Sequence, residues 1–262
     1  MNFLFIGDIV GKPGRTVVKA LLPELRKEFK LDFVIANSEN ITHGKGISEK
    51  HIKEMQNAGV DYFTGGNHSF ANEESYDYYN TVNCPVLRPM NFPEGCPGRG
   101  FAEISIGKKK ILLMNAIGNI NMPGTYDRVL PAVDAVLQKF SKKKFDAIIL
   151  DLHAETTAEK YTMRHFVDGR VSVQVGTHTH VPTADAHVTE KGLGYISDIG
   201  MTGAVDSSLG VKSELTLKKQ LTQMPVKFEP EEKYPYYLRA VYFEVERGEC
   251  GKMELVQRKV EN

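Results

Sequence analysis

Short apolar runs alternate with amphipathic stretches along the first part of the chain. The runs with the length and composition of buried strands are FLFIG (3–7), DFVIAN (32–37) and VDYFTGG (60–66). Between them, apolar residues recur at helical spacing from 14 to 29, where we expect Pro23 to kink the helix. Ser48 and Gly59 are suitable residues to begin and end a second helix, which reaches about Asn57. This repetition is typical of βαβ units with a largely parallel sheet.

Antiparallel pairing is predicted in the middle and at the end of the chain. Residues 81–100 are rich in Pro, Gly and Asn and predict a long loop. Hairpins are predicted at 101–118 and at 236–260, the second with its turn at Gly248 to Gly251. Between the hairpins we expect helices at 126–140 and 156–167 and strands at 145–155 and 171–180. The pattern predicts an α/β fold, and the length of 262 residues predicts a single domain, 1–262.

The composition adds limits on partners and location. Hydrophobic residues make up 41% of the chain and charged residues 25%, as in a globular protein. Lys+Arg and Asp+Glu balance at 33 each, so no net charge attracts nucleic acid or an anionic membrane, and we expect a small-molecule partner. The short N-terminal apolar run lacks a basic leader and no stretch could span a bilayer, so we expect a cytoplasmic protein. The cysteines Cys84, Cys96 and Cys250 indicate neither disulfides nor a thiolate zinc site.

The stretch GDIVGKPGR (7–15), directly after the first predicted strand, invites comparison with a phosphate-binding loop. In a P-loop the lysine is followed by Ser or Thr, whereas Lys12 is followed by Pro13. The spacing of Gly7, Gly11 and Gly14 does not fit G-x-G-x-x-G either. An acidic residue, Asp8, is left at the end of a strand with some other role.

Polar residues lie at the carboxyl ends of five of the predicted strands. They are Asp8, then Glu39 and Asn40 of NSEN, Asn67 and His68 of GGNH, His153 of DLHAE, and His178 and His180 of GTHTH. In open α/β sheets, ligands bind outside the carboxyl ends of the strands. Carboxylate, amide and imidazole groups at one rim suit two adjacent divalent transition-metal ions that share one carboxylate.

Each of these residues also has a structural explanation. The acids and amides could be helix caps or ordinary loop residues, and His153 could be a hydrogen-bonded imidazole at a helix start. His178 and His180, two apart on an extended segment, would point the same way, and both explanations stay open for them. The remaining candidates, His43, His51, His165 and His187, are expected in loops or on exposed faces. His43 follows Asn40 closely enough to approach a substrate.

The order of these motifs resembles the calcineurin-like metallophosphoesterase pattern, which runs D-x-H, G-D-x-x-D, G-N-H-[ED], a lone His and G-H-x-H. The chain departs from this pattern because Val10 replaces a histidine, Glu39 stands for the shared aspartate, and Ser69 follows GNH. The departures match a narrower group. GDIVGKPGR, NSEN, GGNH, DLHAE, GTHTHVPTAD and SDIGMTG closely resemble the YmdB-like bacterial phosphodiesterases over nearly the whole chain.

The resemblance implies a metallophosphoesterase-type α/β/β/α sandwich, with two mixed central sheets flanked by helices. It implies a dinuclear iron or manganese centre, although zinc also suits these ligands, and hydrolysis of 2′,3′-cyclic nucleotides by a metal-bridged hydroxide. It assigns Asp8, Glu39, Asn40 and His180 to one metal, and Glu39, Asn67, His153 and His178 to the other. Glu39 would then bridge the metals, Asn40 would replace the histidine missing at Val10, and His68 would protonate the leaving group.

Other functions are compatible with parts of the pattern. Amidohydrolases also use an H-x-H pair, but theirs follows the first strand of a barrel, whereas His178 and His180 come late in this chain. A regulatory protein could retain the metals with little turnover, and a broader phosphomonoesterase could use the same ligands. The sequence leaves the native metal, the substrate and the oligomeric state open, including a homo-oligomer.

Overall fold

Two mixed sheets form the centre of the molecule. The computed structural model describes residues 1–261. The first sheet has the strand order β2-β11-β12-β1-β3-β4, with β13 paired to β12. Its strands are β1 (Asn2–Ile6), β2 (Asp8–Ile9), β3 (Phe33–Asn37), β4 (Tyr62–Thr64), β11 (Met201–Ala204), β12 (Tyr236–Glu246) and β13 (Glu249–Val260). Strands β1, β3 and β4 run parallel, whereas β12 is antiparallel to β1, β11 and β13.

The second sheet has the order β5-β6-β7-β8-β10-β9. Its strands are β5 (Phe101–Ile106), β6 (Lys109–Ile117), β7 (Ala147–His153), β8 (Val173–Thr177), β9 (His187–Val188) and β10 (Gly194–Ile196). The four inner strands are parallel, and β5 and β9 form antiparallel edges. Both sheets are therefore mixed, as predicted.

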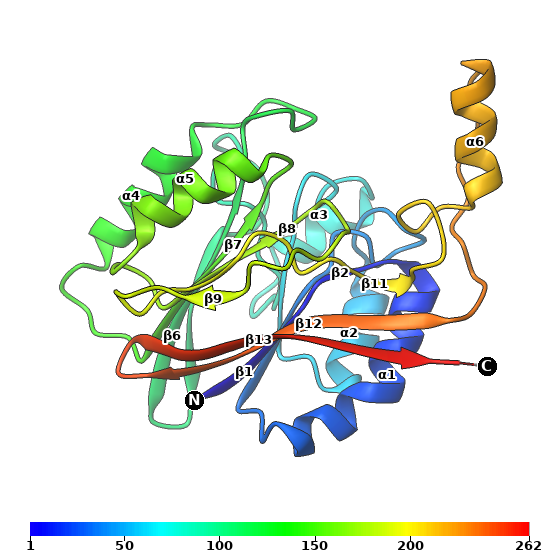
Figure 1. The fold of residues 1–262 in the computed structure, drawn as a ribbon. Coiled ribbons are helices and arrows are strands. Elements are labelled where there is room, and N and C mark those ends of the chain that lie inside the picture. Colours follow the sequence, from blue (N-terminus) through cyan, green and yellow to red (C-terminus); the bar gives the residue numbers. More distant parts are fainter. Residues whose placement is uncertain (262) are drawn as a thin grey trace.

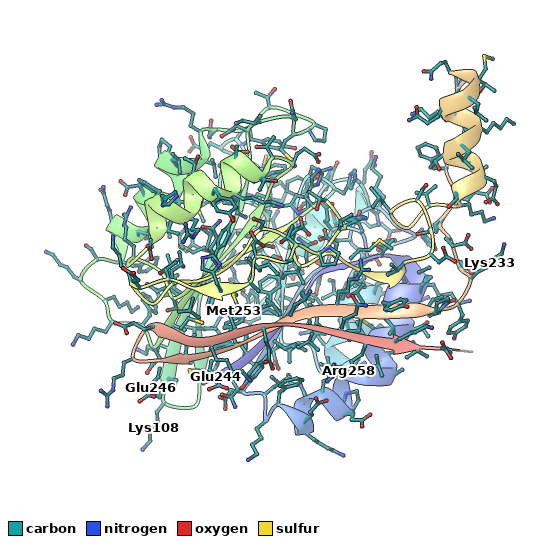
Figure 2. All side chains as sticks on the ribbon, viewed as in Figure 1. Lys108, Lys233, Glu244, Glu246, Met253 and Arg258 are labelled. Atoms are coloured by element: carbon teal, nitrogen blue, oxygen red, sulfur yellow. The ribbon has the colours of Figure 1, made fainter. Side chains whose placement is uncertain are left out.

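Helices cover the outer face of each sheet (Figure 1). The described residues form the helices α1 (Gly11–Glu28), α2 (Glu49–Ala58), α3 (Glu74–Tyr79), α4 (Val129–Lys139), α5 (Thr157–Val167) and α6 (Ser213–Thr222). Buried side chains of α1 and α2 pack on the first sheet, and those of α4 and α5 pack on the second. Helix α6 projects from the body in Figure 1, and none of its residues is buried. Charged side chains of the β12–β13 hairpin, such as Glu246 and Arg258, point outward in Figure 2.

Strand β1 shows why the layers stack in this way. Its successive side chains point to opposite faces of the sheet. Leu4 and Ile6 pack toward α1 and α2, whereas Phe3 and Phe5 pack between the sheets with residues such as Ile149 of β7. Both faces of the strand are buried, which accounts for its continuous apolar run. The result is the α/β/β/α sandwich that the sequence analysis predicted.

Several boundaries differ from the prediction. Helix α1 begins at Gly11 rather than at residue 14, and α4 begins at Val129 rather than at 126. The C-terminal turn consists of Arg247 and Gly248, both at positive φ, instead of Gly248 to Gly251. Positive φ at both central residues is the geometry of a two-residue type I′ turn, which fixes the hairpin register. In residues 1–261, no helix is both long and apolar enough to cross a membrane.

The packing between the sheets predicts which substitutions destabilise the fold. Phe5 is fully buried between the sheets, so Phe5→Ala should lower the free energy of unfolding by about 3–5 kcal/mol. Leu221→Ala on α6, where the side chain is 83% exposed, should change it by less than about 0.5 kcal/mol. Urea unfolding of both variants measures the difference, and equal effects would contradict this description of the core.

Candidate metal centre

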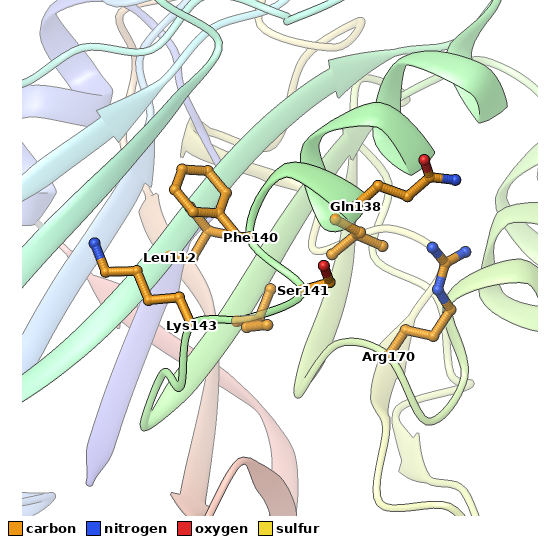
Figure 3. Close-up of a pocket in the computed structure, with 8 residues that line it drawn as sticks. Leu112, Gln138, Phe140, Ser141, Lys143 and Arg170 are labelled. Carbon is orange, nitrogen blue, oxygen red and sulfur yellow. The ribbon is translucent and has the colours of Figure 1, made fainter.

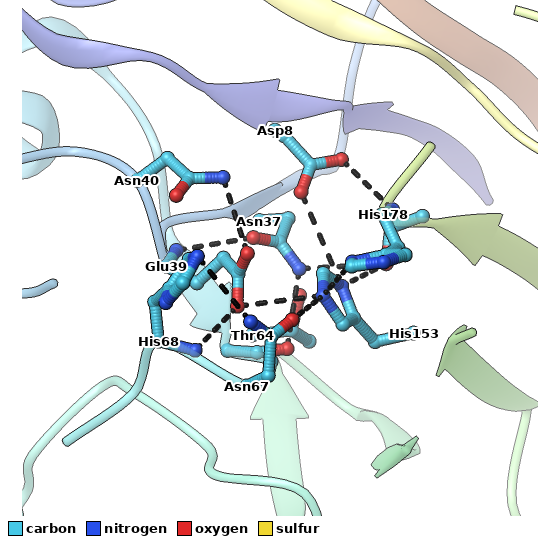
Figure 4. A network of polar contacts seen from close by, with 12 residues as sticks. Asp8, Asn37, Glu39, Asn40, Thr64, Asn67, His68, His153 and His178 are labelled. Atoms are coloured by element: carbon cyan, nitrogen blue, oxygen red, sulfur yellow. Dashed lines mark hydrogen bonds and ion pairs between the residues drawn. The ribbon is translucent and has the colours of Figure 1, made fainter. Parts of the chain in front are cut away.

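The predicted strand-end residues converge at one edge of the sandwich (Figure 4). In the first sheet, Asp8 begins β2 directly after β1, and Glu39 and Asn67 follow the ends of β3 and β4. His153 ends β7 and His178 follows β8 in the second sheet. The carboxyl ends of the parallel strands of both sheets thus meet, as expected for a ligand site in an α/β fold.

One group of ligand atoms surrounds Nε2 of His153. This nitrogen lies 3.4 Å from Oε2 of Glu39, 3.0 Å from Oδ1 of Asn67 and 3.0 Å from Nδ1 of His178. Ligand atoms of Glu39, His153 and His178 all lie within 4.8 Å of one another. Carboxylate oxygen and imidazole nitrogen at this spacing could hold a transition-metal ion.

A second group lies on the other side of Glu39. Nδ2 of Asn40 lies 3.1 Å from Oε1 of Glu39 and 3.1 Å from Nε2 of His180. Oδ1 of Asp8 lies 4.0 Å from the same nitrogen of His180. The two oxygens of Glu39 therefore face different ligand groups. Rotation of the side-chain amide of Asn40 by about 180° exchanges its nitrogen and oxygen, so Asn40 could contribute an oxygen ligand.

Two observations test whether the site fits a cation. Oδ1 of Asp8 is buried and has no hydrogen-bond partner within residues 1–261, a costly state for an anionic oxygen unless a cation is bound. Gly66 leaves the site open: a Cβ atom there would lie 2.3 Å from Oε2 of Glu39 and 2.4 Å from Nε2 of His153. The residues present therefore fit a bound metal ion.

The electrostatics of the site also favour a positive charge. Burial alone would raise the pKa of Glu39, but the nearby His153 and His68 outweigh it and lower this pKa to about 2. Burial likewise opposes charge on His153, but Glu39 and Asp8 outweigh it and raise its pKa to about 9. Burial and the proximity of His153 lower the pKa of His178 to about 3. Glu39 and Asp8 thus stabilise a positive charge between them, and a bound metal ion would supply such a charge.

A buried hydrogen-bond chain orients His153. Nδ1 of His153 lies 2.9 Å from Oγ1 of Thr177, which donates to Oδ1 of Asp151 at 2.8 Å. Because Thr177 uses its proton on Asp151, Nδ1 of His153 is the donor to Thr177, and Nε2 is turned toward the site. Asp151 and Thr177 were not predicted as site residues, although polar residues inside otherwise apolar buried strands are a recognisable signal.

His68 lies beside these ligands but is not one of the residues whose ligand atoms surround Nε2 of His153. Its backbone N–H donates to Oε2 of Glu39 at 2.8 Å, and its ring Nε2 lies 3.3 Å from Nδ2 of Asn67. The side chain is half-buried, and burial lowers the pKa of its imidazole. A lower pKa makes the protonated ring a stronger acid.

The backbone of the GTHTH segment differs from the prediction. Strand β8 ends at Thr177, so His178 and His180 are not on an extended strand. Their φ values are 104° and 65°, in the left-handed region that non-glycine residues rarely adopt. The two rings reach the same site because the loop bends, not because alternate strand residues share a face.

The remaining histidines are only partly as expected. His43 and His165 are exposed, and His187 is half-buried. His51 is buried, contrary to prediction, with Nδ1 at 2.8 Å from Oγ of Ser48 and 3.1 Å from Oγ1 of Thr42. These two hydroxyl groups provide hydrogen-bond partners for the imidazole, so His51 can be buried in the first turn of α2.

A separate pocket of about 290 Å³ lies away from this site (Figure 3). It is lined by residues such as Leu112, Phe140 and Arg170. Leu112 and Ile148 lie near the starts of β6 and β7, whereas His153 ends β7. The pocket therefore lies toward the opposite end of the strands and takes no part in the ligand groups.

Comparison with known proteins identifies the family. The family model described as YmdB-like protein matches residues 4–257. The chain belongs to the YmdB-like family. A relative from Bacillus subtilis (strain 168), named 2′,3′-cyclic-nucleotide 2′-phosphodiesterase, is 41% identical over 228 residues, which cover 87% of this chain and 85% of the relative.

Solved structures agree with this assignment. A structure described as a novel phosphatase from Mycoplasma pneumoniae has a TM-score of 0.91 and 34% identity, covering 99% of this chain and 93% of that chain. The NAD nucleotidase of Haemophilus influenzae has a TM-score of 0.58 and 16% identity, covers 98% of this chain and 55% of that chain, and shows the fold alone. This YmdB-like protein is a phosphoesterase with a metallophosphoesterase-type fold, and that fold implies divalent metal ions.

The close approach at Gly66 yields a test of the metal site. Gly66→Ala should weaken metal binding by about 10- to 100-fold, because the new methyl group would displace Glu39 and His153. Gly251→Ala is the control, since a Cβ atom there meets nothing within 4 Å in the described part of the chain. Elemental analysis of both purified variants gives the metal content. Wild-type metal content in Gly66→Ala would place the ions elsewhere.

Proposed function

We propose that this YmdB-like protein is a dinuclear metal-dependent phosphodiesterase that hydrolyses 2′,3′-cyclic nucleotides. The observation that carries the dinuclear proposal is the arrangement around Glu39, whose two carboxylate oxygens face two separate ligand groups. A carboxylate placed in this way can bridge two cations. The substrate class is carried over from the Bacillus subtilis relative, which is 41% identical.

The ligand assignment follows the two groups. Asp8, Glu39, Asn40 and His180 would hold one metal, and Glu39, Asn67, His153 and His178 would hold the other. Oxygen ligands predominate in the first group, since Asn40 contributes an amide where the wider superfamily has a histidine. Iron or manganese suits such mixed oxygen and imidazole sets, and zinc also binds them.

The chain's own residues would orient the substrate and move one proton. When bound, the metal ions would neutralise phosphoryl oxygens and lower the pKa of coordinated water. Hydrolysis adds water to phosphorus and breaks one ester bond to the ribose, so the departing ribose oxygen must gain a proton. His68 is the candidate donor, because its ring lies beside Asn67 and is half-buried. General acid catalysis of this kind typically contributes about 10²- to 10⁴-fold.

The central experiment measures metal content and substrate preference together. The purified protein should hold two transition-metal ions per chain and should hydrolyse 2′,3′-cyclic nucleotides faster than simple phosphate monoesters. Chelation should abolish turnover, and adding Mn²⁺ back should restore it. Preference for a monoester would indicate a broader phosphomonoesterase, and bound metal without turnover would indicate a regulatory protein. Full activity with one ion or none would reject the dinuclear centre.

The proposed roles of His68 and Asp8 can be separated. His68→Ala should keep both metals yet lose about 10²- to 10⁴-fold in turnover of a cyclic nucleotide. A nitrophenyl phosphodiester should suffer less, because its leaving group is stable as an anion. Asp8→Ala removes an anionic ligand, so metal content and activity should fall together. If His68→Ala loses metal in step with activity, or slows both substrates equally, His68 is not the proton donor.

A further inference from the structure

The SDIGMTG motif (197–203) has no part in the function proposed so far, yet it contains a deeply buried ion pair. Nζ of Lys160, on α5, lies 2.8 Å from Oδ2 of Asp198, and both side chains are 2% exposed. Removing two charges from water is costly, and an apolar pair of the same volume is often at least as stable. The fold alone therefore does not account for this pair.

Asp198 holds the backbone between two proposed metal ligands. Its Oδ2 accepts a hydrogen bond from the backbone N–H of Thr179 at 3.0 Å, and its Oδ1 accepts one from the N–H of Gly200 at 2.8 Å. Thr179 lies between His178 and His180 in the sequence. A single carboxylate thus ties the peptide between the histidines to the loop after β10.

The histidine segment needs an external restraint. His178 and His180 have φ values of 104° and 65°, which residues with a side chain adopt uncommonly. Other contacts reach the histidines themselves: the N–H of His178 donates to Oδ2 of Asp8 at 3.3 Å, and Nε2 of His178 lies 3.0 Å from Oε2 of Glu155. The carbonyl of His180 accepts from the N–H of Met201 at 3.1 Å, and Nδ1 of His180 lies 3.1 Å from the carbonyl oxygen of Leu209. Of these contacts, only those of Asp198 act on the residue between the two histidines.

Lys160 completes this arrangement. Room for its side chain comes from Gly176, where a Cβ atom would lie 3.2 Å from Cδ of Lys160 and 1.7 Å from the carbonyl oxygen of Ser197. Its ammonium group neutralises Asp198, which accepts from the N–H of Thr179, the residue next to His178, whose N–H donates to Asp8. Without Lys160, Asp198 would add an unpaired negative charge beside the ligand groups.

We propose that Lys160 and Asp198 are positioning residues, whose buried ion pair holds the His178–His180 segment in the conformation that directs both imidazoles to the metal centre. This inference rests on the proposed function, because the two histidines are assigned as ligands there. Each of the two ligand groups contains one of these histidines. Loss of the ion pair should therefore weaken both metal-binding events, whereas loss of a single ligand acts mainly on one.

The test replaces the charged pair by an apolar pair. Apoprotein of the double variant Lys160→Met/Asp198→Leu is titrated with Mn²⁺ beside wild-type apoprotein, with circular dichroism to confirm folding. We expect a folded protein in which both binding events are about 10- to 100-fold weaker. The control is Arg26→Met, which breaks a partly buried ion pair with Asp61. Asp61 precedes β4 at the opposite end of the strands, so this change should lower thermal stability and leave Mn²⁺ affinity unchanged.

Each outcome decides the proposal. Wild-type Mn²⁺ affinity in the folded double variant would overturn it and would make the pair merely structural. If the double variant does not fold, Asp198→Asn, which keeps the shape and one acceptor oxygen, is titrated with Mn²⁺ in its place. Weaker binding would support the positioning role, and wild-type affinity would overturn it. Failure of both to fold would make the pair a folding requirement and would also reject the positioning role. Wild-type apoprotein that binds no Mn²⁺ would contradict the proposed function itself, a result distinguishable from failure of the positioning role alone.

Discussion

The structure depends on a contact between charged groups of two different sheets. Glu39 follows β3 of the first sheet and His153 ends β7 of the second, yet their side chains meet at 3.4 Å while almost completely buried. Adjacent residues along a strand are about 3.3 Å apart, so a slip of one residue between the sheets would separate this pair. The apolar layer around Phe5 and Ile149 holds the sheets in the alignment that the contact needs. The geometry of the site therefore depends on apolar packing that lies outside it.

At this edge of the sandwich, strands and loops orient the histidines in different ways. His153 is the last residue of a strand and is oriented by Thr177 and Asp151, which are themselves strand residues. His178 and His180 lie in a loop with an unfavourable backbone, so their directions depend on hydrogen bonds from elsewhere. Rigid strands thus fix one imidazole, whereas a restrained loop supplies two more.

The sequence predicted the parts of this molecule that follow local rules. Continuous apolar runs marked the buried strands such as β1 and β7, and the polar residues after them proved to lie together. Strands of two to four residues, such as β9 and β11, carry too few positions for a period to show. Helix α6 was missed because it buries no residue and so has no apolar face to reveal it. The predicted extended conformation of His178 was wrong, because long-range contacts and not the local sequence determine its backbone conformation.

The buried acids around the site explain why bound cations would stabilise it. Asp8, Glu39, Asp151 and Asp198 are all buried within this region, and Lys160 is the buried lysine that offsets one of them. Burial raises the pKa of Asp8, and it raises that of Asp151 to about 6, so these two acids are harder to keep ionised than they would be in water. Either protons or metal ions must supply the missing positive charge. Metal ions do so without removing the negative charge of the carboxylates, because a ligating oxygen must stay deprotonated. The metal ions that would make the site catalytic would therefore also favour the ionised form of Asp8.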